Sequence, residues 1–129
     1  MPRTKSPHLT EAELRLMQVL WKKGAATVSD VVEAVAKNAG AAAPAYSTVL
    51  TTLRILENKG YVRHTKEGRA FVYEPVVPRD QATEKAVSHL LRRFFKNSAE
   101  LLMLNLLDRK NLDAETIKRL RKRIEEKKP

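Results

Sequence analysis

The sequence predicts a mainly α fold with a small β-hairpin, and three observations carry this prediction. Apolar residues recur at helical spacing along most of the 129 residues, but between residues 61 and 74 their period falls to two. The tripeptide Lys66-Glu67-Gly68 divides this alternating segment, as a three-residue loop does in a hairpin. Beyond Pro78 the helical period returns. Three helices followed by a hairpin form a winged helix-turn-helix, and three further helices follow it here.

The first helix is expected over residues 11–23. Thr10 and Glu13 have the spacing of a capping box, in which each side chain binds the backbone N–H of the other residue. Leu9 and Leu14 occupy the positions of a hydrophobic staple across this N-terminus. Gly24 is expected to end the helix, because glycine is favoured just beyond a helical C-terminus.

Two further helices complete the predicted helix-turn-helix. Residues 25–28 are short enough for a minimal strand or a linker. Ser29 is the expected N-cap of a helix over residues 30–38. The third helix is expected over residues 46–59, where Gly60 ends it in a left-handed conformation.

The third predicted helix has one apolar face and one polar face. A helical wheel places Val49, Leu53 and Leu56 on one stripe, which we expect in the core. The opposite face begins with small hydroxyl side chains, which can bind base edges and phosphates in a major groove. A solvated polar surface is the alternative interpretation. The candidate DNA-binding residues of this helix are Tyr46, Ser47, Thr48, Thr51 and Arg54.

The predicted hairpin carries three basic side chains, Arg63, Lys66 and Arg69. We expect them near the tip of the hairpin, where they would bind DNA phosphates. The alternative is that these charges only protect the edge of the hairpin from pairing with another strand. We favour phosphate binding, because the hairpin directly follows the candidate recognition helix.

Residues 78–127 are expected to form a helical dimerisation domain, and residues 8–77 the winged-helix DNA-binding domain. The arm should contain helices over residues 79–95 and 99–107 and a third that Asp113 caps. Its middle helix is apolar on almost every side, so it should be buried, and the arm is too small to enclose it. A second copy of the chain is expected to cover it, with folding back onto the winged helix as the alternative. The candidate dimerisation residues are Val87, Leu90, Leu91, Phe94, Phe95, Leu101, Leu102, Leu104, Leu107, Ile117, Leu120 and Ile124.

Composition narrows the possible functions. The chain has 25 Lys+Arg against 15 Asp+Glu, a net charge of +10, which favours a polyanionic partner. Both halves are basic. Residues 1–77 contain 11 Lys+Arg against 7 Asp+Glu, and residues 78–129 contain 14 Lys+Arg against 8 Asp+Glu. The absence of cysteine excludes thiol catalysis, disulfides and Cys-ligated metals. The three histidines are far apart in sequence, so we expect no enzymatic activity, no metal and no cofactor.

The sequence also indicates where the chain resides. It contains no apolar run of transmembrane length, so we expect no membrane insertion. Its N-terminus lacks the apolar core of a signal peptide. The expected location is therefore the cytoplasm.

Three segments of the sequence resemble the penicillinase-repressor (BlaI/MecI) family: Tyr46–Leu53, Lys59–Val62 and Glu67–Tyr73. The opening helix, with Leu9–Glu13 and Trp21, is also similar, so the resemblance extends over residues 8–127. It implies a homodimeric bacterial transcriptional repressor from a family that regulates antibiotic resistance. Such repressors bind dyad-symmetric operators through an N-terminal winged helix and dimerise through three C-terminal helices.

The resemblance also bears on individual residues. Thr48 and Thr51 match polar positions of the family's recognition helix, whereas Ser47 stands where its best-known members carry Lys, which implies a different target sequence. Many members are paired with a membrane metalloprotease sensor, whose signal leads to cleavage of the arm at an Asn-Phe bond. The matching candidate cleavage site is Asn105-Leu106, with Leu in place of Phe.

A winged-helix module that binds RNA or an acidic protein is the alternative function. The basic run Lys118–Arg123 would then meet the acidic partner. We favour a solvated face of the last helix for this run, with Ile117, Leu120 and Ile124 packing inward on the opposite side.

Overall fold

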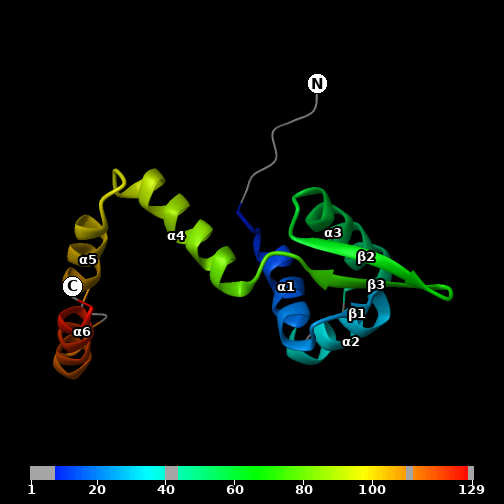
Figure 1. Cartoon of the computed structure of the whole chain (residues 1–129), viewed down its shortest axis with the longest axis horizontal. Helices are drawn as coiled ribbons and strands as arrows, with labels where there is room; N and C mark the ends of the chain where they lie inside the picture. Colours follow the sequence, from blue (N-terminus) through cyan, green and yellow to red (C-terminus); the bar gives the residue numbers. More distant parts are fainter. Residues whose placement is uncertain (1–7, 40–43, 110–111, 128–129) are drawn as a thin grey trace. The chain divides into compact units, whose positions relative to one another are not determined.

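A computed structural model describes residues 8–39, 44–109 and 112–127 of the chain (Figure 1). It confirms a mainly helical fold with a small antiparallel sheet, and it divides into two compact units between Ala86 and Val87. The elements in chain order are α1 (Glu11–Lys23), β1 (Ala26–Thr27), α2 (Val28–Ala39), α3 (Tyr46–Asn58), β2 (Val62–Glu67), β3 (Ala70–Pro75), α4 (Arg79–Phe94), α5 (Ala99–Asp108) and α6 (Ala114–Glu126).

The ends of α1 are as predicted. The Glu13 N–H donates to Thr10 Oγ1 at 3.2 Å, and the Thr10 N–H donates to Glu13 Oε1 at 2.9 Å, which completes the capping box. Gly24 follows the last helical residue with a φ of +86°, and its N–H donates to the Leu20 carbonyl. Glycine adopts this backbone conformation without the steric penalty that a Cβ atom brings.

The start of α2 differs from the prediction. Ser29 is not the N-cap; it lies exposed in the first turn of a helix that begins at Val28. Thr27 takes the capping role, because its hydroxyl accepts from the Asp30 N–H at 3.0 Å while its own N–H donates to Asp30 Oδ2 at 3.2 Å. This reciprocal pair is the geometry of a capping box with Asp as the acidic member. The same Thr27 ends β1, so strand and helix follow each other directly.

The first unit contains one three-stranded antiparallel sheet with strand order β1-β3-β2. Ala26 pairs with Tyr73, which adds the two-residue β1 to the hairpin. Pairing in the hairpin runs from Val62 and Pro75 to Glu67 and Ala70. The loop is therefore the two residues Gly68-Arg69, and the predicted three-residue loop is wrong. Gly68 has a φ of +64°, as the first position of a two-residue hairpin loop often requires.

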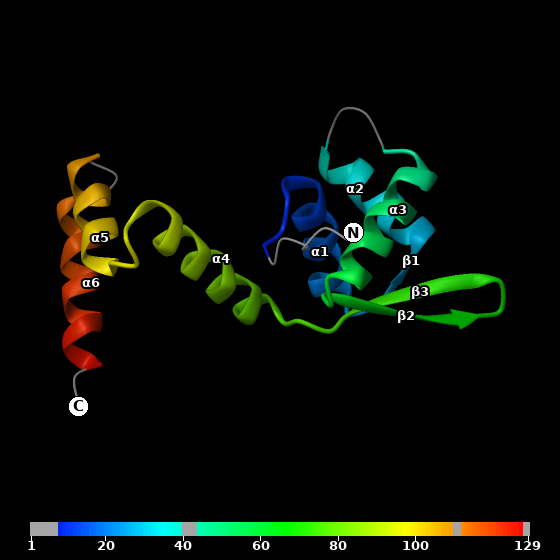
Figure 2. The ribbon, with the colours of Figure 1, turned by 90° about the horizontal axis from the view of Figure 1, so that it is seen from above.

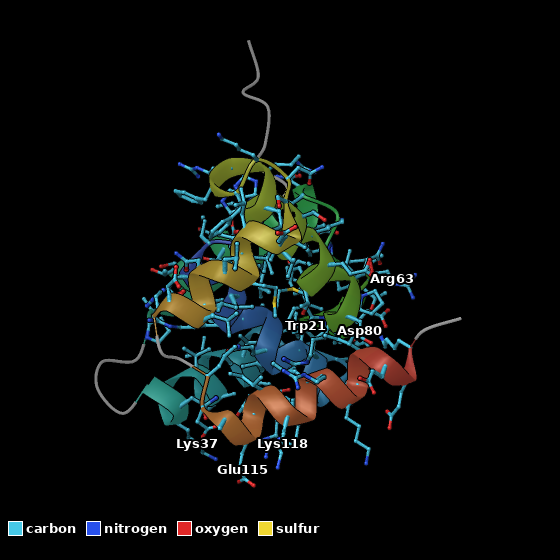
Figure 3. All side chains as sticks on the ribbon, turned by 90° about the vertical axis from the view of Figure 1, so that its left-hand side faces the viewer. Trp21, Lys37, Arg63, Asp80, Glu115 and Lys118 are labelled. Atoms are coloured by element: carbon cyan, nitrogen blue, oxygen red, sulfur yellow. The ribbon has the colours of Figure 1, made fainter. Side chains whose placement is uncertain are left out.

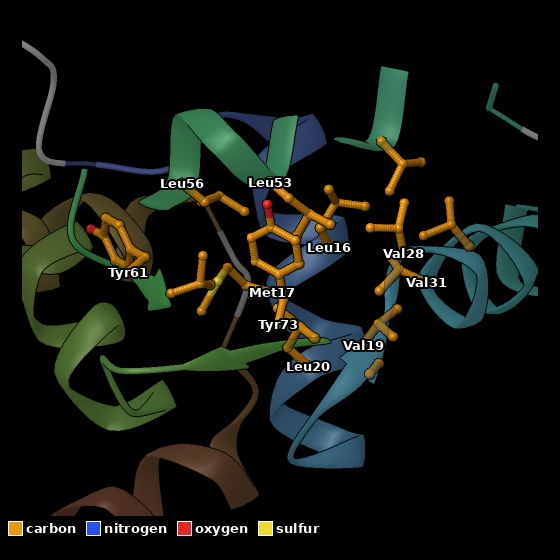
Figure 4. Packing of buried hydrophobic residues seen from close by; sticks show 14 of the residues in the cluster. Leu16, Met17, Val19, Leu20, Val28, Val31, Leu53, Leu56, Tyr61 and Tyr73 are labelled. Atoms are coloured by element: carbon orange, nitrogen blue, oxygen red, sulfur yellow. The ribbon is translucent and has the colours of Figure 1, made fainter. Parts of the chain in front are cut away.

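Sixteen buried apolar residues of the first unit form one core between its helices and its sheet (Figure 4). The predicted stripe of α3 is confirmed: Val49 is 2% exposed, and Leu53 and Leu56 are fully buried. Two aromatic residues, Tyr61 and Tyr73, are the largest buried side chains. The full cluster is Leu16, Met17, Val19, Leu20, Ala26, Val28, Val31, Val35, Val49, Leu53, Leu56, Tyr61, Val62, Tyr73, Val77 and Ala82.

The compact first unit extends past the end of the sheet into α4. Ala82, in the first turn of α4, is 7% exposed and belongs to the core cluster. The predicted division into domains at residues 77 and 78 follows the Pro-rich connection, whereas the compact unit continues for two further helical turns. That functional division stays a prediction.

The second unit contains the rest of α4, together with α5 and α6, and the last two helices lie side by side (Figures 1 and 2). Ser98 caps α5 by accepting from the Leu101 N–H, as predicted. Asp113 caps α6 by accepting from the Thr116 N–H at 2.8 Å, also as predicted. This hydrogen bond lowers the pKa of the Asp113 carboxyl below its usual range. No described residue of α5 or α6 is buried in the single chain.

Candidate nucleic-acid interface

The polar face of α3 is accessible to a ligand. Tyr46, Ser47, Thr48, Thr51 and Arg54 are all exposed, while the apolar stripe on the other side lies in the core. Leu50, at the boundary of the two faces, is half-buried and packs against the core. The expected orientation of the helix is therefore observed. The roles of its residues in DNA binding stay predictions.

The hydroxyl groups on this face differ in their availability. Thr52 Oγ1 donates to the Thr48 carbonyl at 2.9 Å, so its hydrogen is used within the helix. Among the described residues, the side chains of Ser47, Thr48 and Thr51 make no hydrogen bond to protein. These three hydroxyls can donate and accept, which is what binding to base edges and phosphates requires.

The N-terminus of α3 is a further feature that sequence reasoning missed. Ala45 is its N-cap, and this residue makes no side-chain hydrogen bond to the first turn. The first backbone N–H groups of a helix have no intrahelical acceptor, and the helix dipole favours an anion there. A helix start without a polar capping residue was the available sequence signal. A phosphate placed there would receive backbone hydrogen bonds beside the exposed hydroxyl face.

The basic residues of the hairpin do not form the single cluster that was predicted. Arg63 is the second residue of β2 and pairs with Glu74 across the strands, so it lies at the base of the hairpin. Its Nε is 2.8 Å from Glu74 Oε1. Lys66 and Arg69 lie close to the turn and are exposed. The prediction that all three side chains lie near the tip is therefore wrong for Arg63, because the register pairs it with Glu74, one position from the base of the hairpin.

An ionisable pair connects the hairpin with α3. His64 Nδ1 on β2 lies 2.8 and 2.9 Å from the two carboxylate oxygens of Glu57 on α3. The imidazole also contacts the rings of Phe71 and Tyr73, with centroids 5.4 and 5.3 Å away. Burial, and secondly the charge of Glu57, raises the pKa of the Tyr73 hydroxyl. This contact between two elements was not predicted, since no local pattern pairs these residues.

A buried ion pair holds the other end of α3. Lys59 Nζ lies 2.8 Å from Glu13 Oε1 on α1, and the two side chains are only 8% and 6% exposed. The ammonium also donates to the His8 carbonyl at 3.3 Å. Burial raises the pKa of Glu13, but the hydrogen bonds and charge of Lys59 and the Thr10 hydrogen bonds outweigh it, so its pKa lies below the ordinary value. The C-terminal end of α3 is thus tied to the start of α1.

The predicted dimerisation residues are exposed or half-buried in the single chain. The most exposed are Phe94 at 67% and Ile124 at 59%. Met103, which the prediction omitted, is also exposed and lines an apolar groove of about 310 Å³ between α5 and α6. The candidate cleavage site lies within α5, with Asn105 exposed and Leu106 half-buried.

The basic run of α6 is solvated in the single chain. Lys118, like Glu115 one turn earlier, extends away from the helix (Figure 3). Within the described ranges, none of the five cations of residues 118–123 forms an ion pair, and Arg119 donates only to Thr116 Oγ1. The predicted inward packing is partial, since Ile117 is half-buried while Leu120 and Ile124 are exposed. Of the helices that the structure describes, none has the length and apolarity needed to cross a membrane.

Sequence comparisons relate the chain to known repressors. A family model described as penicillinase repressor matches residues 9–126. The chain is 32% identical over 124 residues to a penicillinase repressor of Bacillus licheniformis, and the match covers 96% of this chain and 94% of that protein. It is 22% identical over 123 residues to the methicillin resistance regulatory protein MecI of Staphylococcus aureus, with 95% of this chain and 98% of that protein covered.

Structural comparisons agree with these relatives. The solution structure of the DNA binding domain of the repressor BlaI is 33% identical, with a TM-score of 0.51, and the match covers 61% of this chain and 93% of that chain. The complex structure of hsRosR-S4 is similar in fold, with a TM-score of 0.53 at 16% identity, over 80% of this chain and 89% of that chain. Both likenesses support the winged-helix architecture of the first unit.

Proposed function

The chain belongs to the penicillinase repressor family of DNA-binding transcriptional repressors, and from this premise we propose that it binds a dyad-symmetric operator as a homodimer. The observation that carries the proposal is the exposed hydroxyl face of α3 beside a helix N-terminus without a capping side chain. A recognition helix enters the major groove with its N-terminal residues toward the bases. A dimer would place two such helices in successive grooves of the operator.

Within each half-site, α3 would supply the base contacts and the hairpin the phosphate contacts. Ser47, Thr48 and Thr51 have hydroxyls that are available to base edges, and Arg54 on the same face would reach guanine or phosphate. Lys66 and Arg69 near the turn would bind phosphates. Arg63 would have to leave Glu74 before it could reach a phosphate. This exchange would cost little free energy, because the pair is solvent-exposed.

The arm would provide the dimer interface. The apolar side chains of α4, α5 and α6 are exposed in the single chain, and a soluble monomer rarely leaves so many of them uncovered. Pairing two arms would cover them. A paired repressor that holds both half-sites would exclude RNA polymerase far better than a single chain, since the second contact becomes intramolecular.

Release of the repressor would follow from cutting the arm. We propose the bond between Asn105 and Leu106 as the site and a membrane metalloprotease sensor as the origin of the signal, which is what the resemblance to this family implies. The bond lies inside α5, so a protease would need that helix to unwind locally first. Cutting there would separate α6 from α4 and break the proposed interface.

The proposal is tested by fluorescence anisotropy at about 150 mM salt, a physiological ionic strength. Duplex DNA from upstream of the protein's own gene is compared with scrambled DNA of equal length. A preference of about a thousandfold or more is the expected result for specific readout. Footprinting of the preferred duplex would then locate the half-sites.

A matched pair of variants assigns the binding to α3. Thr51→Ala should weaken binding to the preferred duplex, whereas Ser29→Ala, an exposed hydroxyl in α2, should leave it unchanged. Equal and steeply salt-dependent binding to both duplexes would reduce the interaction to electrostatic contact. Absence of binding to either duplex would contradict the proposal.

A further inference from the structure

The exposed face of α3 carries an apolar side chain that the core does not cover. Among the described residues of the first unit, the large apolar side chains that are exposed are Tyr46, Ile55 and Val76, and two of these lie on α3. Ile55 is 41% exposed. Leu53 and Leu56 are fully buried and point into the core on the other side of the helix (Figure 4). Single exposed apolar side chains are common on protein surfaces, so the meaning of Ile55 depends on its surroundings.

Ile55 lies within the polar face of α3 and not at its boundary. It follows Thr51 by four residues and Thr48 by seven, so the three side chains line one side of the helix. At about 100° per residue, Ile55 is turned about 130° away from the middle of the buried stripe, whereas Leu50 is turned about 95° away. Leu50 is half-buried and packs against the core. Ile55 stands instead beside two threonines whose hydroxyls are available to a ligand.

The major groove of DNA contains one partner for such a side chain. Of the four bases only thymine presents a methyl group there, and the other groups on the base edges are hydrogen-bond donors and acceptors. An isoleucine against those polar groups would displace their water without replacing its hydrogen bonds, which costs free energy. Against a thymine methyl group it gains free energy, because apolar surface on both partners is removed from water.

We propose that Ile55 is a specificity-determining residue that contacts the 5-methyl group of one thymine in each half-site of the operator. The inference rests on the proposed function, in which α3 enters the major groove. Thr48 and Thr51 bind hydrogen-bonding groups of the base edges, and Ile55 adds a contact that recognises only a methyl group. Such a contact discriminates against the same base pair without its methyl group and accepts a methylated cytosine.

Thymine and uracil differ in this methyl group alone, so base analogues isolate the contact. The full-length protein is titrated by anisotropy with the footprinted operator, in which uracil replaces one thymine per half-site at dyad-related positions, one pair of positions at a time. The variant is Ile55→Ala, which should retain the fold because the site is exposed and alanine favours a helix. Val76→Ala is the matched control, since Val76 is 53% exposed in the same unit but lies outside α3.

For the wild type and Val76→Ala, we expect uracil at one pair of positions to weaken binding by about fifteenfold. Burial of one methyl group corresponds to about fourfold in affinity, and the operator contains two half-sites. In Ile55→Ala the same replacement should cost less than about twofold, while binding to the unmodified operator is already weaker. The double-mutant cycle between protein and DNA measures this coupling directly.

Methylated cytosine measures the same contact independently. Cytosine is placed at the sensitive positions instead of thymine, and duplexes with cytosine and with 5-methylcytosine are compared. Methylation should strengthen binding of the wild type by about fifteenfold and change that of Ile55→Ala by less than about twofold. The two duplexes have identical hydrogen-bonding groups, so contacts of the threonine hydroxyls cannot produce this difference.

The outcomes that contradict the inference are distinct from those that contradict the proposed function. If the operator is bound specifically but uracil costs as much in Ile55→Ala as in the wild type, or costs nothing at any position, this inference is overturned and the proposed function stands. Equal affinity for operator and scrambled duplexes would overturn the proposed function and this inference with it.

Discussion

Similar apolar residues are buried within the first unit and remain exposed in the second. In the first unit, sixteen apolar side chains from helices and sheet close over one another within a single chain. In the second unit, helices of comparable length leave Phe94, Leu104 and Ile124 exposed at 67%, 47% and 59%. A helix pattern thus specifies an apolar surface, but the number of surrounding elements decides whether one chain can cover it. We therefore place DNA reading in the unit that is complete alone and assembly in the other.

The same contrast appears in the charges. The three ion pairs among the described residues all lie in the first unit. The second unit is nevertheless the more basic, with 12 Lys+Arg against 6 Asp+Glu in residues 87–129. Because both units are basic, net charge alone does not indicate which of them binds the nucleic acid. We propose the winged helix as the DNA-binding unit on the available hydroxyls of α3 and on the relatives of this chain.

The largest expected effect comes from placing a charged side chain in the proposed dimer interface. Leu104→Asp on α5 should give a monomer whose operator affinity is lower by about 100- to 10,000-fold, because the second half-site is lost. Light scattering and anisotropy on the same sample would measure both effects. The thermal unfolding of the winged helix should be unchanged.

The converse substitution acts on the other unit. Leu53→Ala removes a fully buried side chain and should lower the free energy of unfolding of the first unit by about 2–5 kcal/mol while the arm still dimerises. If Leu104→Asp remained a dimer, the apolar surface of the arm would need a different partner and our assignment of the two units would fail.

A second prediction concerns the buried pair at the end of α3. Glu13→Gln retains the capping box but leaves the Lys59 ammonium buried without its carboxylate, so stability should fall by about 3–5 kcal/mol. The pKa of Glu13 is lower in the folded state than its ordinary value of 4.5. The charge of Glu13 therefore stabilises the fold at pH values above 4.5. That stability is lost as the pH falls through the lower folded pKa.

Urea denaturation of wild type and Glu13→Gln at several pH values measures this difference. The gap between them should be constant near neutral pH and narrow below about 4.5. Glu11→Gln, an exposed carboxylate in the same helical turn, is the control and should change stability by less than about 1 kcal/mol. A gap that did not depend on pH would show that the carboxylate charge has no such role.

Local sequence patterns predicted most of the fold. The capping box of Thr10 and Glu13 and the stripe of Val49, Leu53 and Leu56 follow from fixed spacings within one helix, and the structure has them as expected. The error at the start of α2 arose because two neighbouring residues could each serve as its N-cap. Thr27 and Ser29 are both good caps, and only the pairing of β1 with β3 makes Thr27 the residue that ends a strand and begins a helix.

The candidate site was predictable only as far as single elements determine it. The face of α3 followed from the helical period, whereas Lys59 and Trp21 had no local signal for their partners. Lys59 and Glu13 are 46 residues apart, and Trp21 and Val77 are 56 apart. Such contacts depend on how helices pack, which periodicity does not describe. The misplacement of Arg63 has the same origin, since strand register is a property of two segments together.

A third prediction separates base recognition from phosphate binding within the first unit. Thr48→Ala should reduce operator affinity by about 1–3 kcal/mol and relax the preference for one base pair, because it removes an available hydroxyl from α3. Lys66→Gln should weaken binding to operator and scrambled DNA alike. It should also reduce the slope of log K against log salt by about 0.9. Anisotropy titrations at four salt concentrations measure both quantities, and equal behaviour of the two variants would contradict the division of roles.

The smallest expected effect concerns the pair at the base of the hairpin. Because Arg63 is 69% exposed and Glu74 37% exposed, Glu74→Gln should change stability by less than about 1 kcal/mol. The substitution frees the Arg63 guanidinium and removes one negative charge, so operator affinity should rise and its salt slope should steepen if this arginine reaches a phosphate. Glu33→Gln, an exposed carboxylate of α2, is the control for net charge alone. Equal gains in the two variants would mean that Arg63 stays with its own strand pair and that the hairpin binds DNA through Lys66 and Arg69 only.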